Sequence, residues 1–335
     1  MKNRSLFAMR VCCAVMSLSL ILSGCVQTDE PSSLPESVSS LEAESGFGGD
    51  PVSGPQGESA PQAQEPSALE AVDLFEGEFS FKKPKRPIPS APNILFLGNS
   101  YTFANDLPAM FEALSWSGGF RADVYELTDG SYRLEYFADP EDELGAKVYE
   151  GLTQYDWDYV ILQEQSRVPT IEAETMMYPA ARTLDALIQN ADGQTVFLMT
   201  WAYRDGDDLT GYGIRKKTTR EEMQAELFMA YDTIARELDA LLSPAGAAFI
   251  RFAKEHPEVE LWDPEDGMHP TAAGSYLAAC TLYATLYNES PVGLEYTAEL
   301  EPETAQALQR CAADLVLGVT EEEPAETDSS DGLAA

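Results

Sequence analysis

Apolar residues in the middle of the chain follow two alternating patterns, short unbroken runs and longer stretches with helical spacing. Strands are predicted at 93–97, 121–127, 158–163, 195–201 and 247–252. In most of these the apolar run is unbroken, which suits strands buried on both faces of a parallel sheet. The intervening stretches predict helices at about 105–116, 178–189, 219–242, 271–287 and 302–317. This alternation predicts an α/β fold, a three-layer α/β/α sandwich around a mainly parallel five-stranded sheet.

The boundaries of two predicted helices carry recognisable signals. The longest helix starts with a capping box, in which Thr218 and Glu221 satisfy each other's backbone N–H groups. Pro270 stands at the first turn of the helix at 271–287, where its missing N–H costs nothing. These signals support helices in the second half of the predicted domain.

The apolar pattern is lost on both sides of this region. Residues 26–81 contain twelve acidic residues, six prolines and no Lys or Arg. Such a composition buries too little apolar surface to offset chain entropy, and it predicts a disordered acidic linker over 25–89. Residues 319–335 have a similar composition and predict a second acidic tail. We therefore expect one folded domain at 90–318.

The first 24 residues have the layout of an export signal. Basic residues precede the apolar stretch "VCCAVMSLSLIL", and "LSGC" follows it. Small residues before a cysteine resemble the lipobox of bacterial lipoproteins, which implies cleavage after Gly24 and a lipid on Cys25. The sequence thus predicts an exported lipoprotein, anchored to the extracytoplasmic side of a bacterial membrane through Cys25. An ordinary signal peptide or a membrane anchor is the alternative.

Charge and cysteine content narrow the possible partners. The 335 residues carry a formal net charge of −36, which disfavours nucleic acid because binding to phosphates requires Lys and Arg. Without the signal segment and a lipidated Cys25, only Cys280 and Cys311 remain for a disulfide. No CxxC or Cys/His cluster predicts a zinc site.

Two segments far apart in the chain carry candidate chemistry. The first predicted strand runs into "GNSYT", which places Ser100 at the carboxyl end of the sheet, where such folds bind ligands. The chain has two histidines, and His269 lies in "DGMHP" with Asp266 three residues before it. An aspartate at this spacing can orient an imidazole, which can in turn take the proton of a serine hydroxyl. Ser100, His269 and Asp266 are therefore the candidate catalytic residues.

Simpler interpretations of the same residues remain open. Ser100 can be a polar turn residue, and His269 a helix-entry residue capped by Asp266. A metal site formed by Asp263, Asp266 and His269 is a further alternative.

The blocks "GNSYT" and "DGMHP" resemble the first and last blocks of the SGNH hydrolases, the GDSL-like esterases. The resemblance spans about 92–293 and implies an SGNH, flavodoxin-like fold with Ser100 as nucleophile, His269 as base and Asp266 as its partner. Gly130, in "LTDGSY", matches the glycine of block two. Its backbone N–H, with that of Ser100, would donate to the oxyanion.

The third block departs from the family pattern. The family has an asparagine after the third strand, whereas this chain has "LQEQS". The resemblance is to a bacterial branch in which Gln165 or Gln163 would supply the missing amide. Structural hydrogen bonds at the strand end are the alternative role for both glutamines.

Residues 201–217 form a predicted loop over the active end of the sheet. It shapes a substrate pocket or is a plain surface loop. The candidate pocket residues, in this loop and beside Ser100, are Asn99, Tyr101, Trp201, Tyr203 and Arg204.

The resemblance implies hydrolysis of acetyl or short acyl esters without a metal or cofactor. Carbohydrate is the leading substrate class, and esters of lipids or other small molecules are the open alternatives. A binding lipoprotein that keeps the fold without useful catalysis is the alternative, motivated by the missing asparagine.

Overall fold

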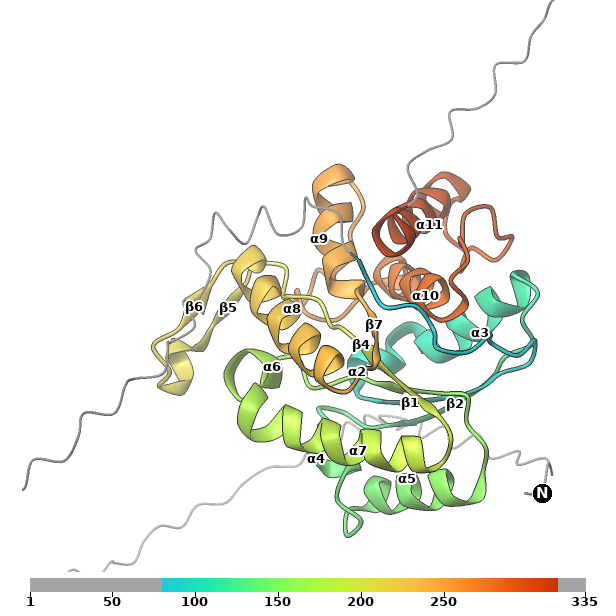
Figure 1. Ribbon diagram of the computed structural model, residues 1–335. Coiled ribbons are helices and arrows are strands. Elements are labelled where there is room, and N and C mark those ends of the chain that lie inside the picture. The colour runs from blue at the N-terminus through green and yellow to red at the C-terminus, as the bar shows by residue number, and fades with distance from the viewer. Residues whose placement is uncertain (1–79, 319–335) are drawn as a thin grey trace, which may run out of the picture. The chain divides into compact units, whose positions relative to one another are not determined.

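The computed structural model describes residues 80–318, and these form a three-layer α/β/α sandwich (Figure 1). Its sheet has the strand order β2-β1-β3-β4-β7, and every neighbouring pair is parallel. The strands are β1 (Asn93–Gly98), β2 (Asp123–Thr128), β3 (Tyr159–Leu162), β4 (Gln194–Leu198) and β7 (Leu241–Ser243). The predicted fold class is confirmed.

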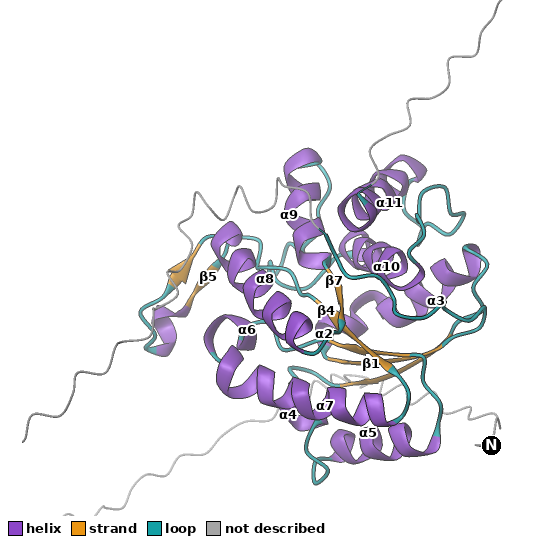
Figure 2. Ribbon diagram, in the orientation of Figure 1, coloured by secondary structure: helices purple, strands orange, loops and turns teal. Residues whose placement is uncertain are grey.

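Helices cover both faces of the sheet, as Figure 2 shows in purple against the orange strands. One face carries α3 (Leu107–Ser117) and α10 (Ala272–Tyr287), with α9 (Ala245–Glu255) and α11 (Pro302–Leu317) packed on α10. The other carries α5 (Glu143–Gln154), α7 (Tyr178–Asn190) and α8 (Arg220–Glu237). Helix α10 is buried along almost its whole length, which explains why its sequence is apolar on all sides.

Short elements lie after the carboxyl ends of the strands. Helix α2 (Ser100–Phe103) and η1 (Ala104–Asp106) follow β1, and α4 (Leu134–Phe137) follows β2. Helix α6 (Val168–Ile171) and η2 (Ala173–Met177) follow β3. After β4 come β5 (Asp207–Asp208), η3 (Leu209–Tyr212) and β6 (Lys217–Thr218), with β5 and β6 paired in an antiparallel ribbon.

The strand order changes direction between β1 and β3, because β2 lies on one side of β1 and β3, β4 and β7 on the other. Ligand sites of parallel α/β sheets lie outside the carboxyl ends of the strands at such a switch point. Ser100 follows β1 and Gln163 follows β3, so both lie at this point.

The fifth predicted strand was placed wrongly. Residues 247–252 belong to helix α9, and the fifth strand is Leu241–Ser243, most of which the prediction had put in the helix at 219–242. Helix α8 ends at Glu237, and Asp239 with φ 53° turns the chain into β7. A short apolar run such as "AAFIRF" does not distinguish a buried strand from a buried helix. The capping box was predicted one residue too early, since Thr219 and Glu222 form it.

The first described residues lie against the domain. Lys82 and Lys85 both pair with Asp239, and the Arg86 guanidinium reaches the carbonyl oxygen of Asp192. The last part of the predicted linker, 80–89, therefore contacts the domain. The predicted signal peptide, Cys25, most of the linker and the tail at 319–335 lie outside the described residues, and the predicted domain limits stay a prediction.

Cys280 and Cys311 are both buried free thiols. None of the helices within 80–318 combines the length and the apolar character needed to cross a bilayer.

Candidate active site

The turn that presents Ser100 depends on the small size of Gly98. A Cβ atom at Gly98 would lie 2.3 Å from Thr102 Oγ1 and 2.6 Å from Gln163 Oε1, distances that require neighbouring atoms to move. Asn99 then caps helix α2, because its Oδ1 accepts from the N–H of Tyr101 at 3.1 Å. Ser100 is the first residue of that helix, and its side chain is half-buried.

A continuous chain of hydrogen bonds joins the three predicted catalytic residues. His269 Nε2 lies 2.8 Å from Ser100 Oγ, and His269 Nδ1 lies 2.5 Å from Asp266 Oδ2. The other carboxylate oxygen of Asp266 accepts from the backbone N–H groups of Met268 and His269. The structure thus brings a hydroxyl, an imidazole and a carboxylate into the order that proton abstraction from a serine requires.

The electrostatics of Asp266 favour its ionised form. Partial burial acts to raise the pKa of Asp266, but hydrogen bonds from the His269 ring and from two backbone N–H groups outweigh it and hold the pKa below its usual range. An ionised carboxylate accepts from Nδ1–H of His269 and leaves Nε2 free to take the proton of Ser100.

The loop that carries His269 is fixed from both sides. Within the loop, the N–H of Asp263 donates to the His269 carbonyl oxygen at 2.7 Å, and Trp262 forms a β-bridge with Pro270. From the serine side, Asn105 Nδ2 donates to the Pro270 carbonyl oxygen at 2.9 Å. Asn105 adopts the left-handed conformation, with φ 55°, close to helix α2. It therefore connects the segment of Ser100 to the segment of His269.

Most of the predicted substrate-pocket residues lie beneath the site instead of lining it. Tyr101 stacks on Trp201 with ring centroids 4.8 Å apart, Trp201 stacks on Phe249 at 4.4 Å, and the Tyr101 ring meets His269 edge-on. Trp201 Nε1 donates to the Met268 carbonyl oxygen at 3.0 Å. Trp201 has no exposed surface and Tyr101 has 5%, so this stack supports the catalytic loop.

Asn99 and Tyr203 are likewise buried. Asn99 Nδ2 donates to the Tyr132 carbonyl oxygen at 2.9 Å, and Tyr203 OH lies 2.8 Å from Ser166 Oγ. Arg204 keeps a partly exposed side chain next to Asp205, and its N–H donates to the Gly267 carbonyl oxygen. Of the predicted pocket residues, Arg204 alone therefore offers appreciable side-chain surface to a ligand, which corrects the pocket prediction for the other four.

The two predicted backbone donors to the oxyanion, the N–H groups of Ser100 and Gly130, differ in whether they are already hydrogen-bonded. Ser100 opens helix α2, where a backbone N–H has no intrahelical acceptor, and no hydrogen bond within residues 80–318 takes it up. The N–H of Gly130 instead donates to Asp129 Oδ1 at 2.7 Å. Gly130 has neither a positive φ nor a crowded Cβ position, and the left-handed residue of this turn is Ser131. The geometry does not direct the Gly130 N–H toward Ser100.

The two glutamines of the third block have different surroundings. Gln163 has no exposed surface; its Oε1 accepts from Asn99 N–H and Thr102 Oγ1, and its amide nitrogen donates to the Glu164 carbonyl oxygen. It holds β3 to the serine turn and cannot reach a substrate. Gln165 is only half-buried, and its Oε1 accepts from the N–H groups of Arg167 and Val168. Those bonds orient the amide, so its NH2 group is the end that remains for other partners, with Ser166 Oγ at 3.3 Å.

Three residues of the site region were missed by the sequence analysis. Asn105 is described above, and Glu164 is a buried carboxyl group between the two predicted glutamines. Phe103 is 42% exposed and lies three residues after Ser100 on the same helix. The sequence signal for Phe103 was an aromatic residue three positions after the serine, and that for Glu164 was an acidic residue in the third block. Neither signal distinguishes a site from an ordinary turn.

A metal site is not supported by the arrangement. Asp263 Oδ1 accepts from the Glu265 N–H, and no group of three His, Cys, Asp or Glu side chains between residues 80 and 318 converges to hold an ion.

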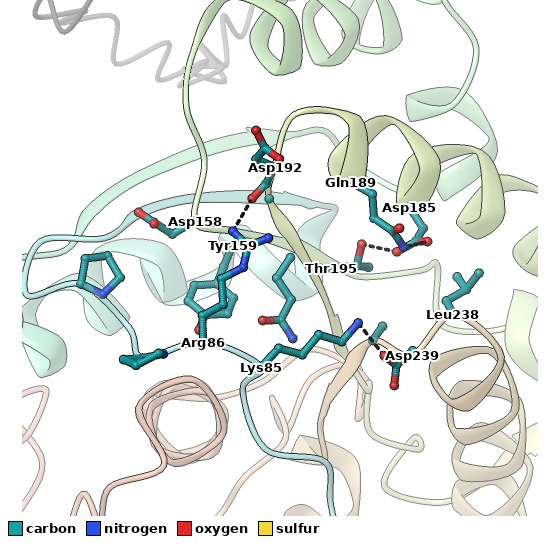
Figure 3. Close-up of a pocket in the computed structure, with 15 residues that line it drawn as sticks. Lys85, Arg86, Asp158, Tyr159, Asp185, Gln189, Asp192, Thr195, Leu238 and Asp239 are labelled. Atoms are coloured by element: carbon teal, nitrogen blue, oxygen red, sulfur yellow. Dashed lines mark hydrogen bonds and ion pairs between the residues drawn. The ribbon is translucent and has the colours of Figure 1, made fainter. Parts of the chain in front are cut away.

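A hollow of about 220 Å³ lies at the opposite edge of the sheet from the candidate site. Figure 3 shows Lys85 and Arg86 reaching over it toward Asp239 and Asp192. Its lining includes Tyr159, the first residue of β3, and Gln194, the first residue of β4. It is therefore at the amino ends of the strands, away from Ser100.

Comparison with known proteins places this fold in a class. No protein-family model and no curated protein sequence matches the chain. Among solved structures, a protein from Slackia heliotrinireducens classed with the SGNH hydrolases shares 32% identity and a TM-score of 0.51, over 58% of this chain and 98% of the other. A DUF4886 family protein from Bacteroides uniformis shares 18% identity and a TM-score of 0.52, over 67% of this chain and 94% of the other.

The fold and the Ser–His–Asp arrangement are those of an α/β serine hydrolase. Given the identity to the Slackia protein over nearly its whole length, the chain belongs to the SGNH hydrolase superfamily. The resemblance predicted from "GNSYT" and "DGMHP" is confirmed.

Proposed function

We propose that this protein is an extracytoplasmic serine esterase that hydrolyses acetyl or other short acyl esters, with carbohydrate as the alcohol, through an acyl-serine intermediate. The observation that carries the proposal is the unbroken contact from Asp266 through His269 to Ser100. A serine hydroxyl is a weak nucleophile unless a base takes its proton, and this contact supplies the base and its orienting carboxylate.

Acylation of the serine is the first half of the proposed reaction. Ser100 Oγ attacks the ester carbonyl carbon while His269 Nε2 takes the hydroxyl proton. The carbonyl oxygen becomes an oxyanion, to which the N–H of Ser100 and the amide of Gln165 donate. The oxyanion then collapses, the bond to the alcohol oxygen breaks, and His269 returns its proton to the leaving alcohol.

Hydrolysis of the acyl-serine is the second half. His269 takes a proton from water, whose oxygen attacks the acyl carbon, and the bond to Ser100 Oγ breaks. Ser100 recovers a proton from His269, and the carboxylic acid leaves. Asp266 keeps the imidazole in one tautomer and stabilises its charged form in both halves.

The openness of the site supports a bulky alcohol. The His269 and Asp266 side chains are 36% and 34% exposed, so the catalytic residues lie near the surface. Phe103, exposed beside Ser100 on helix α2, offers an aromatic face of the kind on which a sugar ring packs.

The proposal is tested by hydrolysis of p-nitrophenyl acetate and of acetylated oligosaccharides by the wild type and by Ser100→Ala. We expect release of nitrophenol and of acetate by the wild type, and loss of both in the variant. A folded wild type that turns over neither class of ester would contradict the proposal.

A binding protein without useful catalysis is the second candidate, favoured by the direction of the Gly130 N–H toward Asp129. A protein of this kind would bind acylated carbohydrate in calorimetry without releasing acid, and Ser100→Ala would leave its affinity unchanged.

Anchoring through a lipid on Cys25 is part of the proposed function. The supporting feature is the sequence "LSGC" after an apolar stretch. We expect Cys25→Ala to move the protein from the membrane fraction to the soluble fraction of the cells that express it. Continued membrane association of an unlipidated variant would refute the anchor.

A further inference from the structure

Glu164 places a carboxyl group inside the wall of the site. It follows β3 in the sequence, and its side chain is 1% exposed. Its Oε1 accepts from the N–H of Gln165 at 2.7 Å and from the N–H of Leu134 at 3.2 Å. One carboxyl oxygen therefore connects the segment after β3 with the segment after β2.

Both connected segments lie against the serine turn. The segment 129–134 is held to it through the bond from Asn99 Nδ2 to the Tyr132 carbonyl oxygen. The β3 side is held through Gln163, whose Oε1 accepts from the Asn99 N–H. Gln165 itself is the residue to which we assign an oxyanion donor. The Glu164 carboxyl thus closes a ring of contacts around the turn of Ser100.

We propose that Glu164 is a positioning residue of this site, which in its neutral form fixes Gln165 relative to the 129–134 segment and whose ionisation slows acyl transfer. The inference rests on the proposed esterase function. Glu164 does not touch the reacting atoms in this scheme, because it is enclosed by protein.

The surroundings of Glu164 contain little to stabilise a negative charge. Among residues 80–318, no cationic side chain is bonded to its carboxyl group; Arg133 is nearby, but its NH1 donates to Glu135 Oε1 at 3.0 Å. On the side of helix α8, Tyr231 OH accepts from the Glu164 backbone N–H. Burial raises the pKa of Glu164 to about 8, against the opposing effect of the two backbone N–H donors, while Glu135 raises it and Arg133 lowers it.

Ionisation of Glu164 would affect the step in which charge develops. The anion would lie one residue from Gln165, and a fixed negative charge near a forming oxyanion disfavours it. We therefore expect turnover to fall as the pH rises through the titration of Glu164.

The test compares pH–rate profiles of Ser100-dependent ester hydrolysis for the wild type, Glu164→Gln and Glu164→Leu. Glutamine keeps the accepting oxygen and cannot ionise, so kcat at pH 7 should stay within about threefold of wild type, and the alkaline fall should vanish. Leucine removes the acceptor, so kcat should drop about tenfold or more at every pH, with a smaller change in KM. Glu135→Gln, which removes a neighbouring half-buried carboxylate that raises the pKa of Glu164 and frees Arg133, should keep the alkaline fall but move it to lower pH.

A direct titration of the wild type guards against variants that do not fold. In protein labelled with ¹³C at the glutamate carboxyl carbons, and assigned by its loss in Glu164→Gln or Glu164→Leu, one resonance should titrate near pH 8. Titration below about pH 6, or superimposable profiles of the wild type and Glu164→Gln, would overturn the inference. Absence of turnover and of Ser100 acylation at every pH would instead refute the esterase function, and the titration would still report the charge state of Glu164.

Discussion

His269 Nε2 lies 2.8 Å from Ser100 Oγ, although 169 residues separate the two in the chain. The contact forms because β1 delivers Ser100 to the carboxyl edge of the sheet and the loop before α10 returns His269 to the same place. Asn105 and the Tyr101–Trp201 stack then fix the loop of His269 against the element that bears the serine.

Replacement of Asp266 should reduce catalysis without unfolding the protein. Asp266→Asn places an NH2 group or a weaker acceptor next to Nδ1 and favours the wrong imidazole tautomer, so we expect kcat to fall about 10²–10⁴-fold. Asp263→Asn is the matched control, because Asp263 caps the Glu265 N–H in the same loop without bonding the ring of His269. Steady-state kinetics with p-nitrophenyl acetate provide the measurement, and equal activities of the two variants would contradict the assigned role.

Loss of the Gln165 amide should lower the rate of the chemical step. Gln165→Glu keeps an oxygen to accept from Arg167 and Val168 but replaces the NH2 donor, so we expect kcat to fall about 10²-fold with a smaller change in KM. Circular dichroism and thermal unfolding check that the fold is retained. An unchanged kcat in Gln165→Glu would show that another group donates to the oxyanion.

Enlargement of Gly98 should destabilise the domain. The added Cβ of Gly98→Ala would overlap Thr102 Oγ1 and Gln163 Oε1, and we expect a loss of about 1–3 kcal/mol in the free energy of unfolding. Gly211→Ala is the control, because nothing lies within 4 Å of its added Cβ. Urea unfolding of both variants gives the comparison, and equal stabilities would mean that the serine turn tolerates a side chain at position 98.

Glu164 should make stability depend on pH. Its pKa is about 8 in the folded protein and near its ordinary value when unfolded, so the folded state binds the extra proton between these values. The stability that Glu164 contributes in its neutral form is therefore lost as the pH rises from about 4.5 to about 8. Above that range its contribution no longer changes with pH. The Tm of Glu164→Gln minus that of the wild type should be larger at pH 9 than at pH 5, by about 5 °C or more. A Tm difference that is the same at both pH values would contradict the raised pKa.

The sequence predicted those parts of the fold and site that local patterns determine. The buried strand before Ser100 ends in small residues, the D-x-x-H spacing puts Asp266 next to His269, and the scarcity of histidine left few choices for the base. The apolar run at 247–252 was misassigned because burial inside a helix and inside a strand looks alike over six residues.

The remaining features depend on contacts between segments that are distant in sequence. Aromatic residues beside the site were expected to line a pocket, but Tyr101, Trp201 and Phe249 stack with one another across three elements. Gln163 and Gln165 are two residues apart. Only the tertiary structure shows that the Gln163 side chain is fully buried, whereas that of Gln165 is half-buried. No local pattern reveals that Glu164 accepts from Leu134, thirty residues away.

Fluorophosphonate labelling tests the central claim most directly, since the probe reports an activated serine independently of the natural substrate. We predict stoichiometric modification of Ser100 in the wild type, mapped by peptide mass spectrometry, and its loss in His269→Ala and Ser100→Ala. A folded wild type that remains unlabelled, or a His269→Ala variant labelled at the wild-type rate, would contradict it.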